Sequence, residues 1–283
     1  MPTMTTRSSR RPRRRADVGS GLAAAVSLLV MSAAAQAAPR PRIMVMTGLP
    51  LVWGEKGPFD PGSRPAAAYR ELGRSFELQP VDVLDPATLA RGRALFLAQP
   101  QRLAPAELAD LDAWIRRGGR ALILTDPLLA WPSELPPTDI RRPPPVGLLG
   151  PLLDHWGLTL DPPAQAGEVE SRRDGRRLLL DSPGRLRSSG AQCAVDEAGL
   201  TAFCRLGRGS ARVVADADLL RDSLWERRSA ENPAVVEAWL HELTGTAPPP
   251  RPARYSRAEI GVAFMLLALL TATGLLLRRR RNR

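Results

Sequence analysis

The sequence predicts an α/β domain in which a mainly parallel sheet is flanked by helices. Short, almost continuously apolar runs alternate with stretches that have helical spacing, which is typical of βα units around a parallel sheet. The apolar runs lack the alternation of a half-exposed strand, so both of their faces are expected to be buried. Inserted β-hairpins and one C-terminal transmembrane helix complete the predicted fold.

Five runs are predicted to form strands of the sheet. Each run is apolar along most of its length and is bounded by polar, glycine or proline residues. The predicted strands cover residues 43–47, 76–83, 94–98, 121–125 and 211–215.

The clearest predicted helix covers residues 105–117, between the third and fourth strands. Pro105 suits the first helical position, apolar residues recur along one face, and Gly118 ends the helix. Arg116 and Arg117 are explained by the helix C-terminus without any ligand. Two further helices are predicted at residues 146–156 and 232–243.

Residues 168–206 are predicted to form β-hairpins, because their short runs are broken by three turns that contain glycine. If the last of these turns closes a hairpin, Cys193 lies opposite Cys204 at a distance that suits a disulfide. We expect this bond rather than a metal pair, since no histidine is nearby and an oxidising compartment favours it.

Both ends of the chain carry membrane signals. Residues 1–37 combine a basic segment, an apolar stretch and an Ala-Gln-Ala cleavage pattern, which is typical of a signal peptide; an uncleaved signal anchor is the alternative. Residues 258–277 are predicted to form a transmembrane helix, because the last 18 of them carry no charge. A buried core helix is a poor alternative, since this run has no polar face. A proline-rich linker, 246–257, precedes the run and a basic tail, 278–283, follows it.

The excess of positive charge belongs to the two ends. Of the formal net charge of +11, residues 1–42 carry +7 and residues 278–283 carry +5, which leaves −1 for the residues between them. The middle of the chain therefore lacks the basic excess of a nucleic-acid-binding domain, and no nucleic-acid partner is expected. By the positive-inside rule the C-terminal arginines stay in the cytoplasm. We expect a single-pass protein of the bacterial inner membrane whose α/β domain, residues 38–245, is periplasmic.

One longer pattern resembles a known family. The stretch ALFLAQPQRLAPAELADLDAWIRRGGRALILTDP joins a strand, a Pro-Gln turn, a helix and a second strand that ends in Asp-Pro. Together with LLGPLLDHWGLTLDPP and RGSARVVADADLL, it resembles membrane-anchored ectodomains of uncharacterised ABC-type transport systems, including the gliding-motility-associated auxiliary subunits. The resemblance implies a glutamine-amidotransferase-like, flavodoxin-related fold. It also implies a non-catalytic accessory role beside integral membrane transporter subunits.

The residues favour a binding protein over an enzyme. A hydrolase of the amidotransferase type needs a cysteine or serine at the turn after a central strand, with a histidine as base. Here that turn is Gln99-Pro100-Gln101, and both histidines, His155 and His241, lie in predicted helices. No phosphate-binding glycine loop is recognisable. We expect no cofactor, no metal and no catalytic residue; an envelope hydrolase that uses carboxylates and a purely structural envelope protein are the alternatives.

The loops that follow the predicted strands form the candidate binding site for an unknown ligand or partner, because open α/β sheets bind ligands at the carboxyl ends of their strands. Carboxylates there, including Asp218, could hold a divalent cation, although capping of turns is the favoured role for Asp126 and Asp216. The two loop tryptophans could equally form a binding surface or close the core. The candidate residues are Trp53, Glu55, Gln99, Asp126, Trp131 and Asp216.

Overall fold

The computed structural model describes residues 39–247. The predicted signal peptide, transmembrane helix and basic tail lie outside these residues, as does nearly all of the predicted linker. Within the part that is described, no helix is long and apolar enough to cross a membrane.

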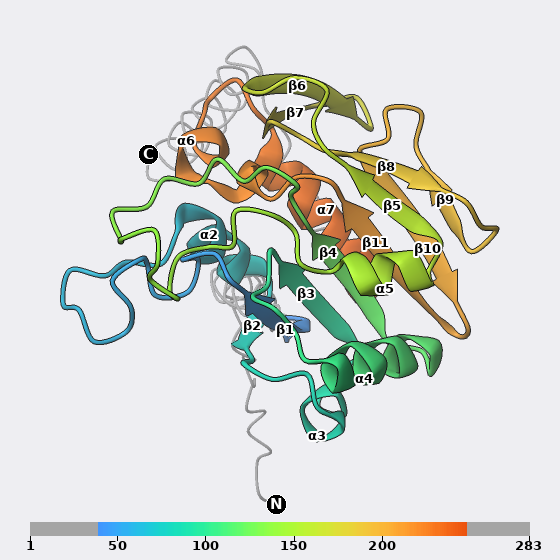
Figure 1. The fold of residues 1–283 in the computed structure, drawn as a ribbon. Coiled ribbons are helices and arrows are strands. Elements are labelled where there is room, and N and C mark those ends of the chain that lie inside the picture. The colour runs from blue at the N-terminus through green and yellow to red at the C-terminus, as the bar shows by residue number, and fades with distance from the viewer. Residues whose placement is uncertain (1–38, 248–283) are drawn as a thin grey trace, which may run out of the picture. The chain divides into compact units, whose positions relative to one another are not determined.

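A seven-stranded sheet lies at the centre of the domain (Figure 1). Its strands are β1 (Arg42–Thr47), β2 (Glu77–Pro80), β3 (Ala94–Ala98), β4 (Arg120–Leu124), β9 (Cys193–Val195), β10 (Thr201–Leu206) and β11 (Gly209–Val214). In the order β2-β1-β3-β4-β11-β10-β9, the first five strands are parallel and the last two are added antiparallel. The prediction of an α/β domain with a mainly parallel sheet is therefore confirmed.

Both faces of the sheet are buried, because successive apolar side chains of a strand point to opposite faces. Along β1, for example, Ile43 and Val45 enter one core and Met44 enters the other. Helices cover each face (Figure 1). The first core includes residues of α2 (Ala67–Ser75), α6 (Asp222–Trp225) and α7 (Asn232–Thr244); the second includes residues of α3 (Pro86–Leu89), α4 (Pro105–Arg116) and α5 (Gly150–His155).

The observed bounds of the helices agree with the predicted bounds to different degrees. Helix α4 begins at Pro105 as predicted, and the Glu107 side chain accepts the backbone N–H of Ala104 (2.8 Å) at its start. The helix predicted for residues 146–156 begins only at α5, so the prediction was wrong for its first turn. Gly147 packs so closely against the sheet that a Cβ atom there would lie 2.2 Å from Thr125 Oγ1. Gly147 therefore lies directly against the residue that follows β4, before α5 begins.

The stretch 168–206 is divided among three sheets rather than forming one insertion. Strands β6 (Glu168–Arg173) and β7 (Arg176–Asp181) form a hairpin, and Asp174 and Gly175 both have positive φ (50° and 76°), as a type I′ turn requires. Strand β8 (Arg185–Ser188) pairs with β5 (Leu158–Asp161). Strands β9 and β10 instead extend the central sheet, because the inward residues of β10 complete its core.

A disulfide joins the last two strands of the central sheet. Cys193 and Cys204 are directly opposed in the β9–β10 register and their Sγ atoms are bonded. Both side chains are buried in the second core. The predicted disulfide is confirmed, and it fixes the short edge strand β9 to its neighbour.

Candidate functional site

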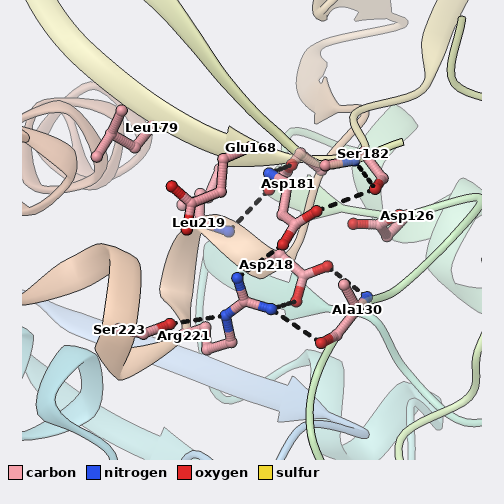
Figure 2. Close-up of polar contacts among 12 residues, drawn as sticks. Asp126, Ala130, Glu168, Leu179, Asp181, Ser182, Asp218, Leu219, Arg221 and Ser223 are labelled. Carbon is pink, nitrogen blue, oxygen red and sulfur yellow. Dashed lines mark hydrogen bonds and ion pairs between the residues drawn. The ribbon is translucent and has the colours of Figure 1, made fainter. Parts of the chain in front are cut away.

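The carboxyl ends of the parallel strands bring several candidate residues to one edge of the sheet. Gln99 directly follows β3, and Asp126 and Asp216 each stand two residues after the ends of β4 and β11. Long segments, residues 48–66 and 125–149, cross this edge between the strands and the following helices. Figure 2 shows polar contacts among residues at this edge, including Asp126, Asp218 and Arg221.

Asp126 is completely buried and joins two strand ends. Its Oδ1 accepts the backbone N–H of Leu128 (2.9 Å), and its Oδ2 accepts the backbone N–H of Ala217 (3.0 Å). Both carboxylate oxygens are thus engaged by the backbone, which holds the chain after β4 beside the chain after β11. This contact pattern is the turn-capping role favoured for Asp126 at the outset.

Asp216 makes a similar pair of contacts with backbone N–H groups. Its Oδ1 accepts the N–H of Leu219 (2.7 Å), and its Oδ2 accepts the N–H of Asp181 (2.9 Å), where β7 ends. Asp218 Oδ2 accepts the N–H of Ala130 (2.6 Å), which fastens the loop after β4 to the turn η1 (Asp218–Leu220). These aspartates therefore connect three segments that are distant in sequence.

Arg221 is the cation at this cluster, and the sequence reasoning missed it. Its Nη2 donates to Asp181 Oδ2 (2.8 Å), and its Nη1 lies 3.6 Å from Asp218 Oδ1 and donates to the Ala130 carbonyl (2.8 Å) (Figure 2). Asp181 was missed as well, since it belongs to the β6–β7 hairpin. The available signal was the spacing of Asp218 and Arg221, an i,i+3 pair directly after a predicted strand. We call Asp126, Asp181, Asp216, Asp218 and Arg221 the aspartate cluster.

Burial dominates the electrostatics of the aspartate cluster. Loss of solvation raises the pKa of Asp126 to about 6 and the pKa of Asp218 to about 7. Loss of solvation also raises the pKa of Asp216 well above its ordinary value, and the charges of Asp126 and Asp218 raise it further. Backbone N–H donors oppose these shifts without cancelling them. The cluster therefore holds protons at a pH at which exposed aspartates have lost theirs.

We expect the folded domain to lose stability as the pH rises from about 5 to about 8. A carboxyl group with a raised pKa stabilises the fold fully below its unfolded pKa, and this contribution is lost as the pH passes through its folded pKa. For Asp126 and Asp218 that loss is complete above about 6 and about 7. Since one pKa unit corresponds to about 1.4 kcal/mol, a fall of roughly 4 kcal/mol is expected.

Urea titrations followed by tryptophan fluorescence at several pH values measure this dependence. The variant Asp218→Asn is expected to flatten the upper part of the profile, because its side chain does not titrate. Asp139 serves as an internal contrast, since Arg141 lowers its pKa to about 2 and its contribution is constant over the interval. A stability that stays level or increases between these pH values would contradict the prediction.

Gln99 is buried and has all of its amide contacts inside the protein. Its Nε2 donates to the carbonyls of Asp126 (3.2 Å) and Pro144 (3.0 Å), and its Oε1 accepts the N–H of Asp126 (2.8 Å). Its φ of 41° turns the chain sharply after β3. Gln99 therefore ties the ends of β3 and β4 to the loop that passes over them.

The two candidate tryptophans have different surroundings. Trp53 is 55% exposed, whereas Trp131 is half-buried and packs on the first core. Glu55 lies between their segments, where both of its carboxylate oxygens accept the N–H of Glu134 (3.0 and 3.1 Å). The structure thus brings Trp53 and Glu55 to the outer face of the loops, away from the buried carboxylates. In residues 39–247 no group of three or more His, Cys, Asp or Glu side chains is arranged to hold a metal ion.

A cavity of about 330 Å³ is lined by the carboxyl ends of β1 and β2 and by Gln101 after β3, beside the point between β1 and β3 where the strand order changes direction. Doubly wound sheets bind their ligands at this switch point, and the volume is at the lower end of the range for small-molecule sites. Trp53, Glu55, Gln101 and Ile140 are among its lining residues. A neighbouring cavity of about 400 Å³ is lined by Trp131 and shares Gln101 and Ile140.

The large apolar side chains that are exposed gather at this same edge. Among the described residues, every one of them follows the carboxyl end of β1, β2 or β4; they are Trp53, Phe59, Val83, Leu128, Ile140 and Val146. Phe59 and Ile140 are 98% and 87% exposed. We call Trp53, Glu55, Phe59, Gln101 and Ile140 the loop surface. Its concentration of aromatic and aliphatic side chains is typical of a surface that binds a partner.

Similar architectures occur in several solved structures. "Exo-beta-1,4-mannosidase Op5Man5 from Opitutaceae bacterium strain TAV5" is 15% identical with a TM-score of 0.47, and the match covers 80% of this chain but 39% of the mannosidase. The "mmIFT52 N-terminal domain" is 13% identical with a TM-score of 0.49, and 74% of this chain and 100% of that domain are covered. At these identities and TM-scores the likeness carries no information about function.

The sequence comparisons are more specific. A search of curated proteins gave no significant match. The model of one protein family does match, over the segment that contains β1 to β5 and the whole loop surface. Residues 40–168 of this chain carry the sequence pattern of the family described as "ABC-type uncharacterized transport system".

Proposed function

We propose that the chain is a non-catalytic accessory protein of an ABC-type transport system. In this proposal it is anchored in the bacterial inner membrane, its α/β domain is periplasmic, and its loop surface binds a transporter subunit. The family match supports the accessory role. The uncharged run within residues 258–277 and the arginines after it support the anchor and its orientation.

The observation that carries the binding role is the position of the exposed apolar side chains. Among the described residues they are confined to the carboxyl edge, where two of them, Trp53 and Ile140, line the cavity beside the switch point. Exposed aromatic side chains of this kind commonly provide most of the binding free energy of a protein interface. The strand order β2-β1-β3-β4-β11 is the one found in flavodoxin-like sheets, which supports the finer likeness to amidotransferase-like auxiliary subunits of the gliding-motility type.

The non-catalytic role is supported by the contacts of the carboxylates at the same edge. Both oxygens of Asp126 and both oxygens of Asp216 accept backbone N–H groups. Neither side chain is exposed to the cavity, since both are completely buried. Proton transfer to a substrate would first require these hydrogen bonds to break.

Cross-linking in the native membrane, followed by identification of the attached chains, tests the proposal. The wild-type protein is expected to be joined to integral membrane transporter subunits and to co-purify with them in a mild detergent. The double variant Trp53→Ala, Phe59→Ala is expected to reduce this recovery by about tenfold or more. Truncation of a central aromatic side chain in an interface commonly lowers the binding free energy by about 2 kcal/mol or more.

The matched control is the double variant Thr159→Ala, Arg172→Ala, which changes two exposed side chains on β5 and β6 outside the loop surface. Its recovery of transporter subunits is expected to equal that of the wild type. Recovery of the wild-type protein alone would refute the accessory role. Unchanged recovery with the loop variant would refute the loop surface as the contact.

A further inference from the structure

Arginines gather at the amino-terminal edge of the central sheet, which is the edge away from the loop surface. Arg93 precedes β3, Arg117 and Arg120 stand at the start of β4, and Arg208 lies in the turn between β10 and β11. Because β3, β4 and β11 are parallel, these positions share one edge. Backbone contacts agree, since the N–H of Arg120 donates to the carbonyl of Arg93 (2.9 Å). We call Arg93, Arg117, Arg120 and Arg208 the arginine edge.

The charge of the arginine edge is not compensated within the described residues. The nearby carboxylates already pair with other arginines: Glu77 with Arg42 (3.0 Å), Asp112 with Arg116 (2.8 Å) and Glu242 with Arg212 (2.7 Å). All four side chains of the arginine edge are exposed, and none of them forms an ion pair in residues 39–247. The aspartate cluster lies at the opposite edge of the sheet.

The chain also enters and leaves the domain at the arginine edge. A cavity of about 310 Å³ is lined by Pro41, before β1, and by Thr244, at the end of α7, together with Arg93 and Arg120. Arg120 Nη1 donates to the carbonyl of Leu243 (3.4 Å), which places the last turn of α7 against this edge. The segments that continue toward the N-terminal apolar stretch and toward the predicted anchor therefore both start here.

The sequence limits how far this edge can lie from an anchor. The described chain ends at Ala247, and the uncharged run starts at Ile260. The residues between them span at most roughly 43 Å, because an extended chain advances about 3.6 Å per residue. Attraction between charges in salt solution is strong only within about 8 Å, so the edge must approach the bilayer closely to interact with it. Because the connection between the domain and the predicted anchor is this short, the arginine edge comes close to the bilayer frequently.

We propose that the arginine edge binds the phosphate groups of anionic phospholipids and orients the domain on the membrane with its loop surface pointing away. The inference rests on the membrane anchor of the proposed function. Guanidinium groups suit this role because their planar donors match two phosphate oxygens at once. Each basic residue near an anionic lipid surface contributes about fivefold to the binding equilibrium, so four of them suffice to hold an anchored domain in one orientation.

Hydrogen exchange of the full chain in lipid nanodiscs tests this orientation. One preparation contains phosphatidylcholine alone, and the other also contains phosphatidylglycerol. In the anionic discs, exchange at residues 91–93, 116–120 and 205–209 is expected to be slower by about fivefold or more. Exchange at residues 53–59 of the loop surface is expected to be equal in both discs. The protection is expected to disappear in high salt, which screens the attraction.

The triple variant Arg93→Gln, Arg117→Gln, Arg208→Gln is expected to abolish the difference between the two discs. Arg120 is left unchanged because it contacts Leu243. The control variant Arg102→Gln, Arg172→Gln, Arg228→Gln removes the same number of exposed arginines elsewhere and is expected to behave as the wild type.

The outcomes separate this inference from the proposed function. A chain that enters the discs but shows equal exchange in both lipids would overturn the lipid contact and leave the accessory role standing. Equal protection in both lipids would overturn recognition of the net negative charge of the anionic lipid in the same way. A chain that does not enter the discs would overturn both the anchor and the lipid contact.

Discussion

Replacement of Arg221 with methionine is expected to lower the free energy of unfolding by about 3 to 5 kcal/mol at about pH 8. Arg221 pairs with Asp181 and lies 3.6 Å from Asp218, and the three side chains are only 14%, 12% and 0% exposed. Without the guanidinium, two buried carboxylates lose their counter-charge while they remain shielded from water. An unpaired buried charge costs more than the original pair contributes, which is why the loss is large.

The pH dependence of this loss identifies its cause. Near pH 5 the cost is expected to be smaller by about half, because a carboxyl group with a raised pKa, such as Asp218, then holds a proton and needs no counter-charge. The double variant Arg221→Met, Asp218→Asn is expected to recover part of the stability at high pH. Arg228→Met, at an exposed position, is the control. Urea midpoints that fall equally at both pH values would point to lost packing instead of lost charge.

Replacement of Asp126 with alanine is expected to cost about 2 to 4 kcal/mol, because it leaves one buried and one partly buried N–H group without an acceptor. These are the N–H groups of Leu128 and Ala217, which join the segments after β4 and β11. The variant Asp126→Asn is expected to cost less, since its amide oxygen can still accept one of the two hydrogen bonds. Thermal unfolding of the two variants beside Asp154→Ala, an exposed position, measures the difference.

The same variant separates a structural role from a catalytic one. If Asp126 is structural, Asp126→Asn is expected to retain the cross-linking pattern of the wild type, whereas the loop variant Trp53→Ala, Phe59→Ala loses it without a loss of stability. An envelope hydrolase would show the opposite pattern. A measured turnover that disappears in a stably folded Asp126→Asn protein would replace the binding role with an enzymatic one.

The central strands could be predicted from sequence because a strand that is buried on both faces consists almost entirely of consecutive apolar residues. Strand β3 has the predicted bounds, and β1 and β4 differ from prediction by one residue. Strand β2 is shorter than predicted, since its register with β1 ends at Pro80 and the N–H of Val81 makes a last contact with the carbonyl of Val45 (2.9 Å). Helices α2, α3 and α6 were not predicted, since helices of nine residues or fewer show too little periodicity.

The candidate site was predictable in position but not in its internal contacts. Parallel strands bring their carboxyl ends to one edge, so the places of Gln99, Asp126 and Asp216 followed from the order of the strands. That all three are completely buried depends on contacts with distant segments, such as the hydrogen bond of Asp216 with the N–H of Asp181 at the end of β7. The ion pair of Arg221 with Asp181 spans 40 residues and could not be inferred from spacing. The exposure of Phe59 and Ile140 could not be predicted from the sequence either, because it depends on the conformation of the loops.

The disulfide between β9 and β10 makes the completeness of the central sheet depend on the redox state of the compartment that contains the chain. Strand β9 contains three residues, and it is the last strand at its side of the sheet. So few backbone hydrogen bonds hold a strand weakly, and an open strand edge pairs readily with other chains. In a reducing cytoplasm β10 would therefore be left as a bare edge with a marginal partner. Oxidation after export would close that edge covalently, so that completion of the sheet and arrival in the oxidising compartment become a single event.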